Sequence, residues 1–472
     1  MITILNTTLG ESRNVARIWI EGQQLTHAGV KIGALYGIKV RPADERIELC
    51  EVDSSYTGQT FTVSKRERNG VVHPLFEVRS NVLREVFEKV NCIRVAIRNG
   101  QIVLTANHIV TQVRERVRRL LDKLRRNVAI GVCSLFHGGG VKDKALHDGL
   151  RRAGVNSFVQ VAVEQDSRYI NASLRNNPEL WTPESVVICS DIRHVNWRNA
   201  LSCELLAAGI PCTGASRSGR AKNRTTVAEE HPDAGTLFID FIDGIKATNP
   251  AIASLECVPE YLNTAGMMVI RSVLKGLGYR LHEHVLHGND FGVLERRERM
   301  VMIAVTEGLP DTFDFAALLP FRTKEATIND IREDVPLDSP RWKPFDYLAD
   351  KELRDKAAGK GFARQLLTGA EDGYGTIGRG YAKFRSTEPF LIHPENPALS
   401  RTLTPLEHVT GKGIPPELIA GESDSVAHEI AGQSVVYPKF VSVFFEVGKL
   451  MLSAIGETVG RVSSCRPALA AA

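Results

Sequence analysis

A cysteine that follows a proline is the first candidate for chemistry in this sequence. Cys212 stands in AGIPCTGASRSGRAKN, residues 208–223, between small residues and a basic run. A thiol beside Arg217, Arg220 and Lys222 lies in a positive field, which favours the nucleophilic thiolate. Taken alone, such a cysteine is more often a buried structural residue. Its role therefore depends on the groups that the fold brings to it.

Three further residues have the chemistry to assist a nucleophile. Glu256 ends the apolar stretch ASLECV, where a carboxyl group can protonate or orient a ring nitrogen. Arg297 and Arg299 stand just before the apolar stretch VMIAVT, and their alternation predicts that both point to one face of a strand.

Polar groups at three strand ends favour a nucleoside cofactor. Glycines follow the first strand in SLFHGGG, Glu164 ends the second in VAVEQD, and Asp191 ends the third in CSDI. Acidic groups there can accept from ribose hydroxyls and an adenine amino group. A plain tight turn explains the glycines alone equally well. The Walker lysine pattern is missing, which argues against a triphosphate.

Alternating strands and helices must position these groups. From about residue 128 the pattern predicts an α/β doubly wound parallel sheet. Residues 311–400 are rich in Pro, Gly, Arg and Lys and have weak periodicity, which indicates an inserted irregular module. An amphipathic helix follows at 434–455. The expected strands are 127–136, 158–166, 185–192, 236–250, 253–258 and 301–306.

The N-terminal part has a different texture. Residues 1 to about 110 contain short β-branched and aromatic runs, with Asn99-Gly100 as a hairpin turn. Residues 113–127 predict a basic amphipathic helix, either a solvated connector or a phosphate contact. The first domain is therefore expected to cover 1–127.

Composition indicates a cytoplasmic globular protein without a membrane segment. The chain has 472 residues, 43% of them hydrophobic and 24% charged, and no signal-peptide pattern at its start. Its eight cysteines form no CxxC pair, which suits a reducing compartment. The histidines of HEHVLHGND do not match HExxH, and we expect no metal site.

The ordered set of motifs resembles the DNA (cytosine-5)-methyltransferases. SLFHGGG, VEQD, CSDI, GIPC, LECV, DFGVLERRER, RTLTPLE and GQSVVYP follow in the order of that family. The likeness covers about 128–310 and 401–455. It implies a class I methyltransferase (Rossmann-like) sheet at 128–310, a target-recognition domain at 311–400 and a C-terminal return at 401–472.

The resemblance also implies a cofactor and roles for single residues. The cofactor would be S-adenosylmethionine, and Cys212 would attack C6 of a cytosine flipped out of double-stranded DNA. Glu256 would act at N3 and Arg299 at O2, with Arg297 beside them. The cofactor-binding residues would be Phe136, Gly138, Gly139, Gly140, Glu164, Asp191, Ile192 and Ser434.

The insert holds the expected DNA contacts. GYGTIGRGYAKFRST, residues 373–387, is either a flexible solvated loop or a recognition segment. Inside the insert of this family, recognition is the preferred interpretation. The expected DNA-binding residues are Arg379, Tyr381, Lys383 and Arg385.

Four positions depart from the family pattern. The family usually has Gln at Thr213, Asn at Cys257, Gln at Glu295 and Asn at Gln433. These departures leave two alternatives open. One is a tRNA cytosine-5 methyltransferase on the same fold, and the other is a DNA-binding regulator with a decayed catalytic core. The sequence leaves open whether a cognate restriction endonuclease is a partner.

Residues 17–40, RIWIEGQQLTHAGVKIGALYGIKV, look similar to AbrB-like swapped-hairpin proteins. In those proteins two chains interlace to complete one small barrel, and exposed strand edges give a physical motive for such pairing. This resemblance implies a homodimer through the N-terminal domain. The alternative is a self-contained β domain.

Overall fold

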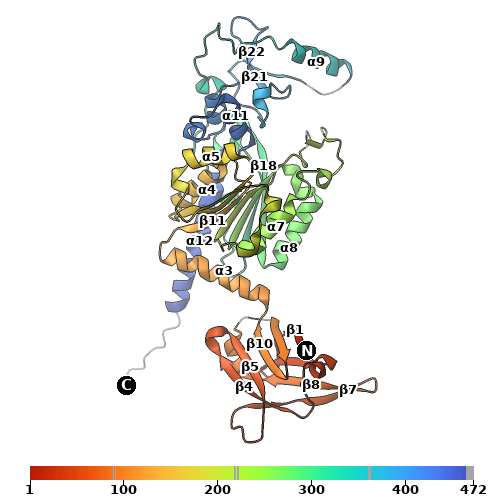
Figure 1. Cartoon of the computed structure of the whole chain (residues 1–472). Coiled ribbons are helices and arrows are strands. Elements are labelled where there is room, and N and C mark those ends of the chain that lie inside the picture. Colours follow the sequence, from red (N-terminus) through yellow and green to blue (C-terminus); the bar gives the residue numbers. More distant parts are fainter. Residues whose placement is uncertain (89, 91, 217–218, 221–222, 360–362, 464–472) are drawn as a thin grey trace, which may run out of the picture. The chain divides into compact units, whose positions relative to one another are not determined.

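The computed structural model describes residues 1–88, 90, 92–216, 219–220, 223–359 and 363–463. Figure 1 shows the chain, which forms two compact units, Met1–Glu115 and Arg116–Ala472. The boundary therefore lies inside the basic helix and not at its end.

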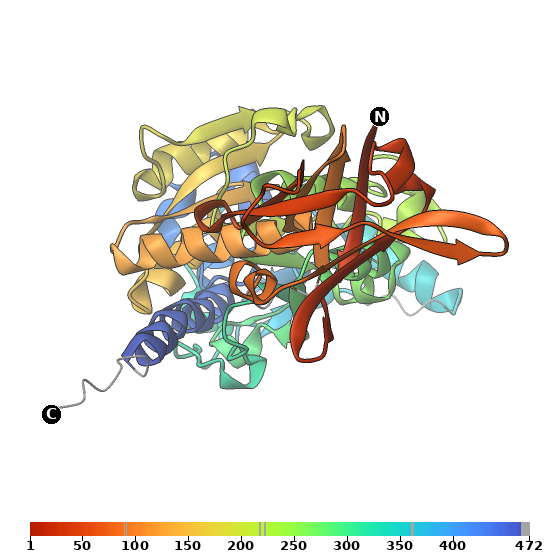
Figure 2. The same ribbon diagram turned by 90° about the horizontal axis from the view of Figure 1, so that it is seen from below.

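Alternating apolar residues build the first unit from two β-sheets. One sheet has six strands in the order β1-β9-β10-β5-β4-β6, and the other has four in the order β2-β3-β8-β7. Every second residue of β3 is buried, as expected for a strand with one face in the core. Figure 2 shows these strands in red and orange, with the β7–β8 hairpin projecting from the unit. The elements are β1 (Ile2–Thr8), β2 (Gly10–Ser12), β3 (Val15–Glu21), α1 (Gln23–His27), β4 (Leu35–Arg41), β5 (Arg46–Val52), β6 (Thr60–Thr62), β7 (Ser64–Arg68), β8 (Val71–Arg79), α2 (Asn81–Val86), β9 (Cys92–Arg98) and β10 (Gln101–Ala106).

This unit has a core of its own. The predicted Asn99-Gly100 turn is confirmed, because both residues have positive φ, 50° and 80°, and they join β9 to β10. The buried Tyr36 hydroxyl donates to the carbonyl of Gly100 at 2.7 Å. Side chains from both sheets and both helices share one hydrophobic cluster. A hydrophobic core within one chain favours the self-contained β domain, although β1, β6, β2 and β7 still form the edges of the two sheets. The homodimer stays a prediction.

The predicted basic helix is confirmed as α3 (His108–Arg125), but several of its cations are structural. The buried Arg116 guanidinium donates to Thr306 Oγ1 at 2.6 Å. Arg119 and Lys123 pair with the fully buried Glu204 at 3.0 and 2.7 Å. These three cations stabilise the second unit and are not free to contact phosphate. The exposed arginines are Arg118 and Arg125 on the helix and Arg126 directly after it.

The Glu204 carboxylate should be essential for stability. It accepts from Arg119, from Lys123 and from the backbone N–H of Gly131 at 2.7 Å. Glu204→Ala is expected to lower the free energy of unfolding by about 3–5 kcal/mol, because it leaves two partly buried cations without their carboxylate partner. Urea unfolding followed by circular dichroism measures the loss. The control Asp122→Ala breaks only the exposed pair with Arg126 and should cost less than about 0.5 kcal/mol. Equal stability of the two variants would contradict the assignment.

Seven strands form the sheet of the second unit, in the order β13-β12-β11-β14-β15-β18-β16. Neighbours from β13 to β15 pair in parallel, and β18 pairs antiparallel with β15 and β16. The expected doubly wound, Rossmann-like fold class is confirmed. The strands are β11 (Ile130–Leu135), β12 (Ser157–Glu164), β13 (Val186–Cys189), β14 (Leu205–Gly209), β15 (Ile252–Cys257), β16 (Tyr279–His287) and β18 (Glu298–Thr306).

Helices cover both faces of this sheet (Figure 1). On one face lie α4 (Val141–Arg152), α5 (Ser167–Asn176) and α12 (Tyr437–Ser463), and on the other lie α7 (Leu237–Thr248) and α8 (Ala265–Gly276). The strand expected at 236–250 is wrong, because this segment forms α7. Its buried residues Leu237, Phe241 and Ile245 recur every four positions, which suits a helix and not a strand.

Residues 311–400 contain short elements, in agreement with their weak periodicity. A small hydrophobic cluster includes Ile328, Tyr374, Ile377 and Tyr381. The segment pairs with the residues just before β18 through β17 (Glu295–Arg296) and β20 (Tyr374–Gly375), which form a separate two-stranded sheet. The other elements here and in the return are α9 (Asp346–Ala357), β19 (Gln365–Leu367), β21 (Pro389–Ile392), β22 (Ser400–Arg401), α10 (Pro405–Thr410) and α11 (Asp424–Gln433).

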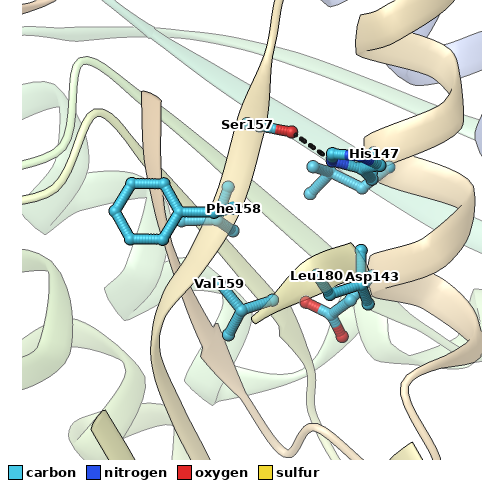
Figure 3. A pocket seen from close by; sticks show the side chains of 8 residues that line it. Asp143, His147, Ser157, Phe158, Val159 and Leu180 are labelled. Atoms are coloured by element: carbon cyan, nitrogen blue, oxygen red, sulfur yellow. Dashed lines mark hydrogen bonds between the residues drawn. The ribbon is translucent and has the colours of Figure 1, made fainter. Parts of the chain in front are cut away.

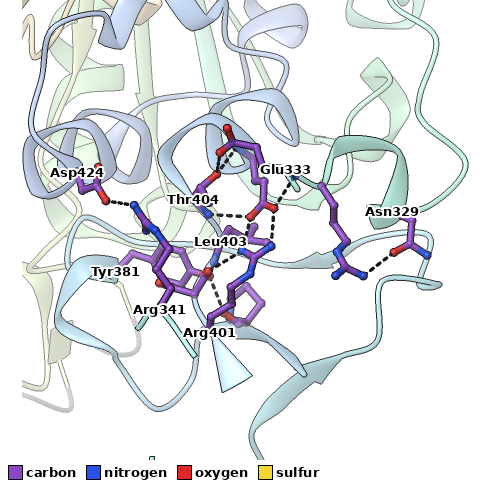
Figure 4. Close-up of polar contacts among 12 residues, drawn as sticks. Asn329, Glu333, Arg341, Tyr381, Arg401, Leu403, Thr404 and Asp424 are labelled. Atoms are coloured by element: carbon purple, nitrogen blue, oxygen red, sulfur yellow. Dashed lines mark hydrogen bonds and ion pairs between the residues drawn. The ribbon is translucent and has the colours of Figure 1, made fainter. Parts of the chain in front are cut away.

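A buried polar network joins the end of the insert to the returning chain (Figure 4). Arg401 donates to both carboxylate oxygens of Glu407 at 2.7 Å, and both side chains are fully buried. Glu407 also accepts from the backbone N–H groups of Thr404 and Glu333 at 2.8 and 2.9 Å. The network fixes the start of α10, which helps to hold the insert in place.

Candidate active site

The parallel strands of the catalytic sheet end at one edge, where the sequence placed its candidate residues. The register sets Glu164 beside Cys189 and Gly209 beside Glu256. The carboxyl ends of such strands form the usual ligand crevice of an open α/β sheet. The candidates at or just after these ends are Phe136, Glu164, Asp191, Cys212 and Glu256.

The glycine turn after β11 has backbone angles that most residues avoid. Phe136, Gly138 and Gly140 have positive φ of 57°, 60° and 76°. A Cβ on Gly139 would lie 2.7 Å from Ile430, and one on Gly140 would lie 2.3 Å from Ser173 Oγ. Packing therefore requires both of these glycines. Gly138 differs, because the nearest atom to its Cβ position is Gln433 Nε2 at 3.6 Å.

Several polar groups around this turn fit a nucleoside cofactor. Gln433 Nε2 is shielded and has no hydrogen-bond partner among the described residues, so a donor faces the turn unused. Glu164 accepts from the backbone N–H groups of Gly138 and Asp166 at 2.8 and 2.9 Å. Each of its oxygens retains a lone pair for a ribose hydroxyl.

The remaining predicted cofactor residues are Asp191, Ile192 and Ser434. The Arg193 guanidinium, hydrogen-bonded to Asp191, lowers the pKa of that carboxyl to about 2, so it stays an acceptor near neutral pH. Ile192 is buried and can pack against a ring. Ser434, after α11, donates its hydroxyl to the carbonyl of Ile430 at 2.5 Å.

Cys212 lies on a tight turn after β14. Its carbonyl accepts from the backbone N–H groups of Ala215 and Ser216 at 3.1 and 2.9 Å, and its side chain is partly exposed. Arg217 and Lys222, expected to provide the positive field, lie outside the described residues. The described positive charge that acts on Cys212 belongs to Arg297.

Glu256 and Arg299 form a buried ion pair. Arg299 Nε lies 3.1 Å from Glu256 Oε1, and the two residues are 8% and 9% exposed, respectively. Arg299 Nη1 also donates to the carbonyl of Glu298 at 2.6 Å. The pair presents a carboxyl group and a guanidinium side by side, as the sequence predicted.

Arg297 is hydrogen-bonded to the insert. It is 3% exposed, and its Nη1 donates to the carbonyl of Ile377 at 3.1 Å. The backbone N–H of Ile377 donates to Glu295 Oε1 at 3.3 Å. Burial and the neighbouring Arg299 lower the pKa of Arg297. Arg297 and Glu295 thus connect this edge of the sheet to the insert, and the catalytic role expected for Arg297 stays a prediction.

Cys257 retains a brace on the Cys212 turn. Burial raises the pKa of the Cys257 thiol, and the nearby Cys212 and Glu256 raise it further, so the thiol can donate. Its Sγ donates to the carbonyl of Ile210 at 3.5 Å. A sulfur donor thus occupies the position where the family pattern has an amide.

Three lysines near the site have shielded ammonium groups and were missed by sequence reasoning. Lys412 donates to the carbonyl of Ala431, and Lys439 donates to that of Leu286 at 3.1 Å. Burial lowers the pKa of Lys439 to about 7 and that of Lys412 well below its usual range. Lys142, in the first turn of α4, is the third. The only sequence signal was Lys439 inside an apolar run.

The expected DNA-binding residues divide into two groups. Arg379, Lys383 and Arg385 are exposed. Tyr381 is fully buried, donates to the carbonyl of Pro389 at 2.6 Å and accepts from the N–H of Leu403 at 2.8 Å. Its expected DNA contact is therefore replaced by a role in the packing of the insert.

A small gap elsewhere in the second unit does not compete with this site. The gap between α4 and β12, with the hydrogen bond between His147 and Ser157, is too tight for a water molecule (Figure 3). Within the described ranges, no group of three or more His, Cys, Asp and Glu side chains is arranged to hold a metal ion. No described helix is long and apolar enough to cross a membrane.

Known proteins resemble this chain over the second unit. The family model for C-5 cytosine-specific DNA methylase matches residues 131–449. Type II methyltransferase M.NlaX of Neisseria lactamica is 29% identical over 280 residues, which are 57% of this chain and 83% of that protein. Type II methyltransferase M.HhaI of Haemophilus parahaemolyticus is 25% identical over 55% of this chain and 80% of its own length.

Solved structures support the fold. The Dnmt2 methyltransferase of S. pombe superimposes with a TM-score of 0.51 and 16% identity, over 70% of this chain and 99% of its own. The methyltransferase EhMeth of Entamoeba histolytica superimposes with a TM-score of 0.50 and 16% identity, with the same coverage. With the family model spanning most of the second unit, the chain belongs to the C-5 cytosine-specific DNA methylase family and is an S-adenosylmethionine-dependent enzyme that methylates cytosine in DNA.

Proposed function

We propose that the enzyme acts on a cytosine flipped out of double-stranded DNA, through a covalent bond between Cys212 Sγ and C6 of the base. The observation that carries the proposal is the common edge shared by the Cys212 turn and the Glu256–Arg299 pair. C5 of cytosine is a weak nucleophile until addition at C6 breaks the aromatic ring. The carbon is inaccessible inside a duplex, so the base must leave the stack.

The bonds formed and broken in the proposed reaction can be followed step by step. The Cys212 thiolate adds to C6, and the electron pair of the C5–C6 double bond moves to C5. Glu256 supports this step at N3 and Arg299 at O2, where negative charge develops. S-adenosylmethionine supplies the methyl group that C5 takes. C5 then loses its proton to water, the C6–S bond breaks, and the thiolate leaves as the ring regains its double bond.

The electrostatics of the described residues support this scheme. The guanidinium groups of Arg297 and Arg299 are buried beside Glu295 and Glu256. Arg299 favours electron density that moves onto the pyrimidine ring, since such charges act strongly in a shielded site. Cys257 supports the scheme as well, because it holds the Cys212 turn through Ile210.

The insert is proposed to read the DNA. Arg379, Lys383 and Arg385 are exposed on it, while the residues between them are packed. The double variant Lys383→Glu and Arg385→Glu is expected to weaken duplex binding about tenfold or more at moderate salt. The slope of log Kd against log salt should fall by about 0.9 for each phosphate that the variant no longer neutralises. Fluorescence anisotropy over a salt series measures both.

A matched control separates the insert from charge in general. Lys275 is exposed at the far end of α8, away from the carboxyl edge of the sheet. Lys275→Glu should leave both affinity and salt slope unchanged. If the two variants behave alike, the insert does not supply the contacts.

Bisulfite sequencing of plasmid DNA from cells that express the protein tests the function as a whole. Protected cytosines in one sequence context are the expected result, and they also report the recognition site. Protected cytosines in tRNA in place of DNA would establish the tRNA alternative. DNA binding without any methylation would establish the regulator with a decayed core.

A further inference from the structure

Lys142 is a half-buried residue with a shielded ammonium group that has no use in the scheme above. It follows the glycine turn directly, as the second residue of α4. Its Nζ is shielded from solvent and has no hydrogen-bond partner among the residues that the structure describes. Buried ammonium groups are almost always paired, since an unpaired one loses its hydration without compensation. An unused donor of this kind indicates a missing partner.

The surroundings of Lys142 place it beside the reaction space. The Cβ position of Gly209 is 4.0 Å from Lys142 Nζ and 3.4 Å from Glu256 Oε2. The ammonium and the catalytic carboxylate therefore approach the same point, at the end of β14 that leads to Cys212. Gly209 places no side chain at this point.

Neighbouring groups do not satisfy this ammonium. Asp143 lies next in sequence, but its carboxylate pairs with His137 at 3.1 Å. Glu256 pairs with Arg299. Burial lowers the pKa of Lys142 to about 8, while the charges of Asp143 and Glu256 oppose that shift. Lys412 and Lys439 are fully buried, and each donates to a carbonyl.

We propose that Lys142 binds the carboxylate of the amino-acid part of S-adenosylmethionine. This inference rests on the cofactor assigned to the family. The cofactor has one anionic group, whereas cytosine has none. The cap residue Gly140 has no side chain to accept from the first N–H groups of α4. The partial positive charge of this helix N-terminus therefore adds to that of Lys142. The ammonium thus pairs with an anion that arrives with the ligand.

Isothermal titration calorimetry with two ligands isolates this contact without turnover. S-adenosylhomocysteine carries the carboxylate, and decarboxylated S-adenosylhomocysteine keeps the amine but lacks it. Lys142→Met should weaken S-adenosylhomocysteine binding about tenfold or more and change binding of the decarboxylated ligand less than about twofold. Lys142→Arg should recover part of the loss. The control Lys144→Met removes an ammonium from the same helix that pairs with Asp148 and Glu179, and it should bind both ligands like the wild type.

Each other outcome overturns the proposal in a recognisable way. An equal loss for both ligands means that Lys142→Met disturbs the site generally. No loss for either ligand, together with weaker duplex binding, means that Lys142 serves a DNA phosphate. If the wild type binds neither ligand, the cofactor assignment itself fails, which is distinct from failure at Lys142.

Discussion

Cys212→Ser is expected to lose methyl transfer by about 10³-fold or more, while duplex DNA and S-adenosylhomocysteine still bind. A serine hydroxyl is a far weaker nucleophile than a thiolate, and no other described thiol is exposed on that turn. Transfer of radiolabelled methyl groups to duplex DNA measures the rate. DNA that contains 5-fluorocytosine tests the bond itself, because fluorine cannot leave as a proton and the adduct is trapped.

The neighbouring thiol gives a matched control for this experiment. Cys257 is 1% exposed and acts on Cys212 electrostatically. The wild type and Cys257→Ser should both form the trapped adduct, and Cys212→Ser should not. An adduct that persists in Cys212→Ser but disappears in Cys257→Ser would move the nucleophile to Cys257. Methylation by Cys212→Ser at a rate close to wild type would end the covalent scheme.

Glu256→Gln is expected to reduce kcat by about 10²–10⁴-fold with little change in ligand binding. Glutamine keeps the size of the side chain but cannot supply a proton at N3, so the loss should appear in the transition state. It also removes the ionic partner of Arg299, which lies 3.1 Å away. Single-turnover kinetics at saturating DNA and cofactor measure the chemical step.

Glu298→Gln is the control, because Glu298 is an exposed neighbour on β18 that pairs with His287. It should leave the single-turnover rate unchanged. Thermal unfolding of both variants separates a loss of fold from a loss of chemistry. A Glu256→Gln enzyme within about tenfold of the wild-type rate would remove Glu256 from the catalytic step.

The sequence alone determined the sheet and the order of its candidate groups. Strand-ending residues such as Glu164, Asp191 and Glu256 are readable because a parallel sheet brings the carboxyl ends of its strands to one edge. Asn99-Gly100 was readable for a local reason, since both residues accept positive φ. The ordered motifs then identified the family. Helix α7 was misread because its short apolar runs were taken for a strand, although Leu237, Phe241 and Ile245 recur at helical spacing.

Tertiary structure decided what each charged or aromatic residue does. Tyr381 stands in a motif that suggests contact with DNA, yet it is buried and supports the insert. Arg297 is also hydrogen-bonded to Ile377 of the insert, a contact that its motif does not reveal. Arg119 and Lys123 look like a phosphate-binding face, but Glu204 lies 81 to 85 positions away in sequence and pairs with both. Lys142 gave no signal at all. Its importance follows from burial without a partner, and burial arises from the packing of elements that are distant in the chain.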